Sequence, residues 1–241
     1  MTVRLTDFEV LTFDCYGTLI DWETGILAAL GPLVVLAGEG PSRDQILEDY
    51  AAEESAQEAE TPGLLYRDIL TEVHKRLERR WGIDAPPSMA EAFGRSVPQW
   101  PAFPDSAETL KYLKKFYKLV ILSNIDNESF AGSNKHLEVT FDAIYSAEII
   151  GSYKPDLRNF EYLVEGIQRD FGLPKGKILH VAQSLYHDHV PARRMGLANA
   201  WIDRRHGEVG GGATPIPENP PKLDFHFHSM ADLAAAHQAI S

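Results

Sequence analysis

The chain has 241 residues, of which 44% are hydrophobic and 24% charged, a composition typical of a globular protein with a sizeable core. Its formal net charge of −12 argues against nucleic acid or an anionic membrane as a partner. Cys15 is the only cysteine, which excludes an intrachain disulfide, and no apolar run approaches the roughly 18 residues of a membrane span. The first residues lack the apolar core of a signal peptide. We therefore expect a cytoplasmic protein.

The first predicted strand ends at a carboxylate. Residues 8–13 form a short apolar run with β-branched and aromatic side chains, which predicts a buried strand. Asp14 follows it directly, and Gly17 predicts a turn three residues later. Taken alone, Asp14 is more simply explained as a turn residue than as a reactive group.

A long helical region follows the first strand. Ser42 is a predicted N-cap, and Gly31-Pro32 is expected to kink or break the first helix. No strand is predicted between residues 20 and 98. The predicted helices are residues 22–37, 42–60, 64–81 and 89–97.

From residue 106 onward, predicted helices and strands alternate. The helices are residues 107–116, 128–137, 158–171, 189–195 and 230–240, and the strands are 119–122, 143–146, 178–182, 199–202 and 224–227. The Gly- and Pro-rich residues 207–221 predict a surface loop. Such alternation predicts an α/β fold with a doubly wound parallel sheet, which the first strand must join. We therefore expect a Rossmann-like core of residues 1–19 and 99–241, with residues 20–98 inserted as a helical cap.

Polar residues follow four of the predicted strands. They are Asp14, the pair Ser123 and Asn124, Lys154, and Asp188. The carboxyl ends of parallel strands meet at one crevice, so these side chains are expected to converge there. Asp14 is then a candidate nucleophile, with its charge stabilised by Lys154.

These residues carry a resemblance to a known family. The segments 14–18, 120–124 and 153–156 and the region of Asp188 are similar, in order and spacing, to the four motifs of the haloacid dehalogenase superfamily. The resemblance covers the core and the placement of the cap. It implies a hydrolase with Asp14 as the nucleophile.

Tyr16 favours one branch of this superfamily. Its phosphatases carry a second Asp two positions after the nucleophile, as the acid that protonates the leaving group, whereas this chain has Tyr16 there. In this respect the chain resembles the L-2-haloacid dehalogenases, whose halide leaves without a proton. The resemblance implies that Asp14 displaces halide from a small anionic 2-halocarboxylic acid, and that water then hydrolyses the ester. It further implies no cofactor and no metal, and two groups of site residues: catalytic Asp14, Lys154 and Asp188, and substrate-binding Tyr16, Thr18, Ser123, Asn124, Gln183 and Ser184.

Two departures from the dehalogenase pattern leave alternatives open. Residues 46–54 contain no arginine where dehalogenases have one for the substrate, although Arg43 or Arg67 would be a substitute. Residues 182–188 have the spacing of a phosphatase motif, with Gln183 in place of its first Asp. One alternative is therefore a phosphatase that holds Mg²⁺ between Asp14 and Asp188. A non-catalytic protein of the same fold is the other.

The remaining expectations concern histidines and partners. His180 lies in an apolar strand and is expected to be a core residue, whereas His187 is expected in one wall of the pocket. His226 and His228 are expected to be structural. The exposed cap helices would allow a homodimer.

Overall fold

The computed structural model describes residues 3–38, 40–207 and 212–240. Its centre is a six-stranded sheet in the order β3-β2-β1-β4-β5-β6, and every neighbouring pair of strands is parallel. The strands are β1 (Val10–Phe13), β2 (Lys118–Ser123), β3 (Ala143–Ser146), β4 (Ile178–Ala182), β5 (Ala198–Ile202) and β6 (Phe225–Phe227).

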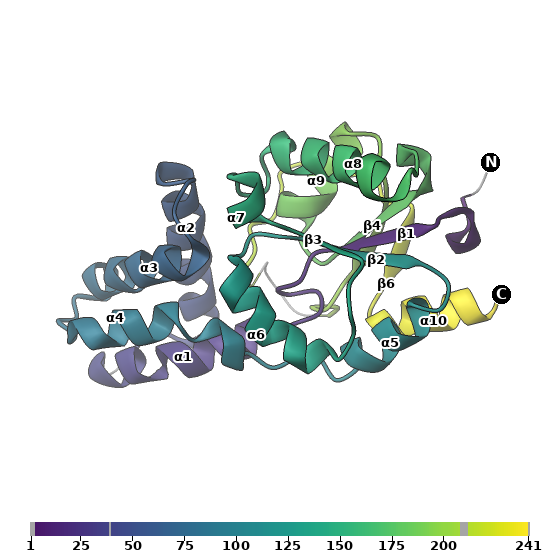
Figure 1. Cartoon of the computed structure of the whole chain (residues 1–241). Helices are drawn as coiled ribbons and strands as arrows, with labels where there is room; N and C mark the ends of the chain where they lie inside the picture. Colours follow the sequence, from purple (N-terminus) through teal and green to yellow (C-terminus); the bar gives the residue numbers. More distant parts are fainter. Residues whose placement is uncertain (1–2, 39, 208–211, 241) are drawn as a thin grey trace.

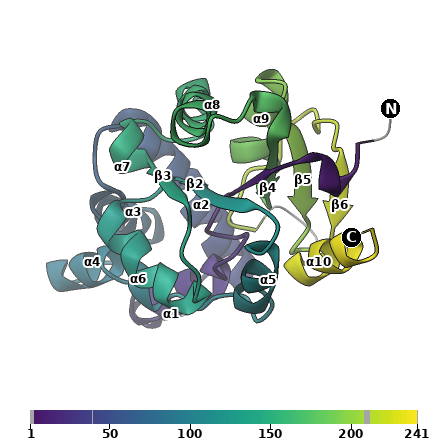
Figure 2. The same ribbon diagram turned by 45° about the vertical axis from the view of Figure 1, so that its right-hand side comes forward.

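Helices cover both faces of the sheet (Figures 1 and 2). In both views α8 and α9 lie over one face, and α5, α6 and α10 lie over the other. The bounds of the core helices are α5 (Ser106–Leu113), α6 (Asn127–Leu137), α7 (Ala147–Ile150), α8 (Leu157–Phe171), α9 (Val190–Arg194) and α10 (Met230–Gln238). The predicted α/β fold with a doubly wound parallel sheet is thereby confirmed.

The buried residues of the strands alternate between two hydrophobic clusters, as the two-residue period of a strand requires. In β1, Val10 belongs to the cluster beneath α8, whereas Leu11 and Phe13 belong to the larger cluster on the other face. Thr12 points to the same face as Val10 and lies opposite His180 of β4 in the strand register. This pairing places a polar contact within the apolar layer.

Four helices between β1 and β2 form a separate layer beside the sheet, on the left in Figure 1. They are α1 (Trp22–Leu36), α2 (Arg43–Glu60), α3 (Tyr66–Trp81) and α4 (Pro87–Gly94). The Ser42 hydroxyl accepts a hydrogen bond from the backbone N–H of Gln45, so the predicted N-cap of α2 is present. We refer to α1–α4 as the cap.

The predicted break in the first helix was wrong, because α1 continues through Pro32. A proline inside a helix removes one backbone hydrogen bond. Here the fully buried side chains of Leu30 and Leu33, on either side of Pro32, hold the helix against the rest of the cap. Packing of the buried face therefore outweighs local propensity.

The cap and the core are joined by close packing and by hydrogen bonds. A Cβ atom added to Gly25 of α1 would lie 2.2 Å from the ring of Trp100, so only glycine leaves room for this indole. The Tyr153 hydroxyl donates to the backbone oxygen of Leu64 at 2.7 Å. No helix in the described part of the chain is long and apolar enough to cross a bilayer.

Candidate active site

Asp14 lies one residue beyond β1, at the carboxyl edge of the sheet, and is only 6% exposed. Its Oδ2 accepts a hydrogen bond from the Thr18 hydroxyl at 2.7 Å. The Thr18 hydroxyl in turn accepts one from the backbone N–H of Gln183 at 2.9 Å. The turn between them depends on Gly17, whose φ of +89° lies in the left-handed region that favours glycine. The turn after β1 therefore fixes one carboxylate oxygen of Asp14, and the other oxygen contacts a cation.

That cation is Lys154, which the loop between α7 and α8 places at the same strand ends. Its Nζ donates to Asp14 Oδ1 at 2.9 Å, to Asp188 Oδ1 at 2.7 Å and to the backbone oxygen of Leu122 at 3.1 Å. All three ammonium donors are thus used, although the side chain is 2% exposed. Burial alone would lower the pKa of Lys154, but the two carboxylates outweigh it and raise the pKa, so the lysine stays charged.

Asp188 lies in a π-helical turn, Leu185–His189, directly after β4. Its Oδ1 also contacts His180 Nε2 at 2.9 Å, and His180 Nδ1 lies 2.8 Å from the Thr12 hydroxyl. Burial opposes ionisation, yet Lys154 and His180 hold the pKa of Asp188 below its usual range. Since an ionised carboxylate only accepts hydrogen bonds, His180 Nε2 is the donor to it. His180 is buried as expected, and it also orients Asp188.

The pKa of Asp14 shifts in the opposite direction. Burial raises it, the nearby charge of Asp188 adds to this, and Lys154 and Thr18 act against it. Asp14, the candidate nucleophile, therefore depends on the charge of Lys154 to stay in its ionised form.

A small cavity of about 30 Å³ opens between these residues and the cap. Such a volume holds one or two water molecules, so a larger molecule binds here only when the cap moves away from the core. The Ser123 Oγ and Asp188 Oδ2 atoms are buried and have no hydrogen-bond partner within the described residues, so both offer a position for a bound molecule. The cavity is lined by Asp14, Tyr16, Trp22, Glu54, Glu58, Tyr66, Ser123, Asn124, Lys154, Ser184, His187 and Asp188.

Most of the site residues expected from the sequence lie together around this cavity, but three have other positions or contacts than expected. Thr18 is fully buried and contacts Asp14 and not the cavity. Tyr16 lines the cavity, but its hydroxyl contacts the Ser133 hydroxyl at 2.9 Å. Gln183 lies outside the cavity, because its side-chain oxygen turns away and accepts from Thr214 at 3.3 Å. Gln183 therefore contributes its backbone N–H, which donates to the Thr18 hydroxyl, and not its side chain, to the site.

Asn124 and Ser184 hold neighbouring segments of the site. Asn124 accepts from the backbone N–H of Lys154 at 2.6 Å and donates to the backbone oxygen of the same residue at 3.0 Å. The Ser184 hydroxyl accepts from the backbone N–H of His187 at 3.0 Å, at the start of the π-helical turn. Burial lowers the pKa of His187 to about 4, so its ring is neutral at pH 7.

Two glutamates of the cap reach the cavity, and the sequence reasoning missed both. Glu54 accepts from the Tyr50 hydroxyl at 2.6 Å and from the Tyr66 hydroxyl. The Asn124 amide donates to both carboxylate oxygens of Glu58 at 3.3 Å. One signal was available: Glu54 and Glu58 continue a buried face of α2 that includes Ile46 and Tyr50, at spacings of four residues.

Burial changes the ionisation of both glutamates. It raises the pKa of Glu54 to about 7, against the opposing hydrogen bonds from the two tyrosines. The pKa of Glu58 rises well above its usual range, through burial and the charge of Glu54. At slightly acidic pH Glu54 is therefore mostly neutral, and burial favours the neutral form of Glu58 as well. A neutral carboxyl group can donate a hydrogen bond.

Neither arginine proposed as a substitute lines the cavity. Arg43 pairs with Glu23 at 3.0 Å, and Arg67 pairs with Glu128 at the surface. Lys154 is therefore the cation of this cavity, and two carboxylates already surround its charge.

This arrangement suits attack by a carboxylate on a small molecule. One oxygen of Asp14 is fixed by a cation and the other by a hydroxyl, and the cap covers both. Asp188 is ionised and has one oxygen without a partner among the described residues, which can accept a hydrogen bond from water.

Comparisons with known proteins concern the family and the fold of the chain. The model of the haloacid dehalogenase-like hydrolase family matches residues 8–182. No curated protein matches the chain.

Solved structures share the fold. A defluorinating L-2-haloacid dehalogenase is 23% identical, with 98% of each chain covered and a TM-score of 0.75. The L-2-haloacid dehalogenase from Xanthobacter autotrophicus, with chloropropionic acid covalently bound, is 16% identical over 97% of this chain and 100% of that one, with a TM-score of 0.76. A HAD-hydrolase from Bacillus subtilis, bound to magnesium, is 18% identical over 97% of this chain and 98% of that one, with a TM-score of 0.70. At these identities the likeness concerns the fold, and the family match over most of the chain shows that this protein belongs to the haloacid dehalogenase-like hydrolases.

Proposed function

We propose that this hydrolase cleaves the carbon–halogen bond of a small 2-halocarboxylic acid, with Asp14 as a covalent nucleophile. The observation that supports this most is the carboxylate of Asp14, held between Lys154 and Thr18 in the covered cavity. Tyr16 stands where related phosphatases carry an acid, and its hydroxyl is directed at Ser133. Because burial raises the pKa of Tyr16 well above its usual range, it is a poor proton donor to a leaving group. Halide, which leaves as a stable anion, needs no such proton.

The reaction proceeds in two steps. In the first, a carboxylate oxygen of Asp14 attacks carbon 2, the carbon–halogen bond breaks, and the halide takes the bonding electron pair. In the second, water attacks the carbonyl carbon of the resulting ester. The bond between the carbonyl carbon and the ester oxygen breaks, and this oxygen takes one proton of the water and leaves as the hydroxyl group of the 2-hydroxy acid. The second proton is released to solvent, and the Asp14 carboxylate is regenerated. Asp188 accepts the hydrogen bond of the attacking water through its free oxygen, and Lys154 stabilises the charge on the ester oxygens.

The substrate carboxylate needs hydrogen-bond donors, since no arginine of the described residues lines the cavity. The Ser123 hydroxyl is buried there without a partner among the described residues and can donate. The carboxyl group of Glu58, whose neutral form burial favours, can donate from the cap side when it is protonated. Two such donors replace part of the hydration that the carboxylate loses on binding.

The alternative of a magnesium-dependent phosphatase fits the residues less well. Mg²⁺ prefers several oxygen ligands in octahedral geometry. Of the four carboxylate oxygens of Asp14 and Asp188, three are engaged by Lys154 or Thr18, and the Lys154 ammonium lies between the two groups. Gln183 replaces the remaining acidic ligand and turns away. The donor set therefore suits a lysine better than a divalent cation.

An isotope experiment tests the covalent step. Enzyme in excess over 2-chloropropionate is allowed one turnover in ¹⁸O-labelled water, and the product is analysed by mass spectrometry. Through the ester, the first product carries unlabelled oxygen from Asp14, whereas direct attack by water gives labelled product at once. Asp14→Asn should abolish chloride release.

A substrate panel separates the alternatives. Chloro-, bromo- and fluoroacetate, 2-chloropropionate and several phosphate esters are each assayed with EDTA and with Mg²⁺. We expect halide release that EDTA leaves unchanged. Phosphate release that requires Mg²⁺, without halide release, would refute the proposal in favour of a phosphatase, and no turnover of any compound would favour a non-catalytic protein.

A further inference from the structure

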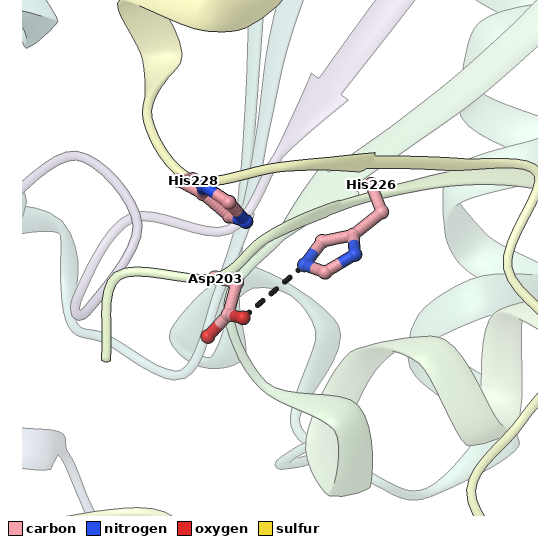
Figure 3. Close-up of side chains that lie close together, drawn as sticks. All are labelled: Asp203, His226 and His228. Carbon is pink, nitrogen blue, oxygen red and sulfur yellow. Dashed lines mark hydrogen bonds and ion pairs between the residues drawn. The ribbon is translucent and has the colours of Figure 1, made fainter. Parts of the chain in front are cut away.

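A second group of reactive side chains lies at the edge of the sheet, outside the candidate active site. Asp203 follows β5 directly, and His226 and His228 lie on or just after β6, the last strand of the sheet (Figure 3). One potential ligand atom of each of these three residues lies within 4.8 Å of the others. The strands therefore bring two imidazoles and a carboxylate to one place.

The strand geometry explains this grouping. His226 and His228 are two residues apart, so their side chains point to the same face. In the register of β5 and β6, Trp201 lies opposite His226, and the N–H of Asp203 donates to the backbone oxygen of Phe227 at 2.7 Å. Trp201 and Asp203 therefore point to the same face of the sheet, and the Asp203 carboxylate lies next to His226 and His228.

Within the group, one contact already has the spacing of two ligands on one ion. His226 Nε2 lies 3.1 Å from Asp203 Oδ2 (dashed in Figure 3). Two atoms bound to the same tetrahedral zinc at ordinary distances are about 3.3 Å apart. The Trp201 indole stacks on the His226 ring at 4.5 Å and limits its rotation.

His206 lies beside this group but is not one of its ligands. Its Nδ1 lies 3.6 Å from Asp203 Oδ2, and its ring stacks on that of His228 with the ring centres 3.6 Å apart. Because a metal ion lies in the plane of the imidazole that binds it, two parallel stacked rings cannot both bind one ion. The adjacent Arg204 is directed elsewhere, at Thr18 and Asp105. Among the described residues, the ion-pair partners of Asp203 are thus His206 and His226.

We propose that Asp203, His226 and His228 form a binding site for Zn²⁺ or a similar late first-row divalent cation, with water as the fourth ligand. Imidazole and carboxylate are the ligands such ions take, and the half-exposed histidines can turn by the small amount that coordination needs. Such an ion would tie the edge strand β6 to the end of β5. This assignment replaces the expectation that His226 and His228 are merely structural, and it does not depend on the proposed reaction.

Calorimetric titration of the purified, tag-free and demetallated chain with Zn²⁺ tests the site. We expect one equivalent to bind, and Co²⁺ in its place to give the visible absorption of a tetrahedral nitrogen–oxygen site. His226→Asn and His228→Asn should each weaken Zn²⁺ binding by at least about 10–100-fold, the loss seen when even outer partners of a metal site are removed. Zn²⁺ should raise the Tm of the native chain but not that of either variant.

Two controls locate the ion. His136→Asn removes an exposed histidine on α6 and should leave binding unchanged. Asp14→Asn alters the candidate active site and should also leave it unchanged. Equal affinity in the native chain and in both β6 variants, no binding at all, or a loss confined to Asp14→Asn would overturn the proposal.

Discussion

Replacing Lys154 by methionine should move the pH at which the enzyme loses activity in acid. The ammonium lies 2.9 Å from Asp14 Oδ1 and is one of the two groups that oppose the rise in the pKa of Asp14. At an effective dielectric constant of about 20, a pair of charges at this distance interacts by about 6 kcal/mol, or about 4 pKa units as an upper bound. Without Lys154 the pKa of Asp14 rises further, and protonated Asp14 cannot attack carbon. We expect the acid limb of kcat/KM to move to higher pH by at least about one unit, with activity below it falling about tenfold for each unit.

The assay is chloride release from 2-chloropropionate as a function of pH. Lys177→Met serves as the matched control, because Lys177 pairs with Glu9 at 3.1 Å at the surface, where both side chains are about half exposed. A titration of the Asp14 carboxyl carbon by NMR, identified with Asp14→Asn, measures the same pKa without any substrate. If Lys154→Met leaves both the acid limb of kcat/KM and the carboxyl titration of Asp14 at the pH of the native chain, the reasoning is refuted, even if kcat falls.

Three further outcomes follow from the contacts of single residues. Because the pKa of Glu54 is about 7, its ionisation above that pH should repel an anionic substrate, and KM for 2-chloropropionate should rise above pH 7. KM for the uncharged 2-chloropropionamide should not rise, and Glu54→Gln should remove the rise seen with 2-chloropropionate. His180→Phe should lower the free energy of unfolding by about 1–3 kcal/mol in urea titrations, since buried Asp188 loses a hydrogen bond, and an unchanged value would contradict the contact. Gly25→Ala should cost about 1–3 kcal/mol by the same measurement, because the added Cβ would lie 2.2 Å from Trp100, whereas Gly31→Ala, with no atom within 4 Å of the new Cβ, should cost nothing.

The sequence was informative about the catalytic edge because of how parallel sheets are built. Asp14, Ser123 and Asp188 each follow a strand that the local pattern predicts, and the carboxyl ends of all such strands lie at one edge. Their meeting with Lys154 therefore required no knowledge of the strand order. The direction of one side chain did require the structure: Gln183 follows β4 by one residue, yet its amide turns to Thr214.

Contacts that depend on strand pairing, or on how the cap packs on the core, could not be predicted from the sequence. His180 meets Thr12 because β4 pairs with β1, two strands far apart in the sequence, and an apolar strand pattern does not reveal its partner. Glu54 and Glu58 contact the cavity because of the angle at which the cap rests on the core. Their spacing on α2 suggests a shared face, but two acidic residues on a helix are usually solvated. Their burial is a property of the assembled layers.

The charges around the cavity explain why these glutamates matter to the proposed reaction. Asp14 and Asp188 carry two negative charges when ionised, and Lys154 carries one positive charge, so the site is negative before an anionic substrate arrives. A charged Glu54 or Glu58 would add to this repulsion, whereas a neutral carboxyl group donates a hydrogen bond. Protonated glutamates in the cap should therefore favour binding, while attack requires an ionised Asp14 in the core. We expect protonation of Asp14 to lower kcat/KM on the acid side, and ionisation of Glu54, with its pKa of about 7, to weaken substrate binding at higher pH.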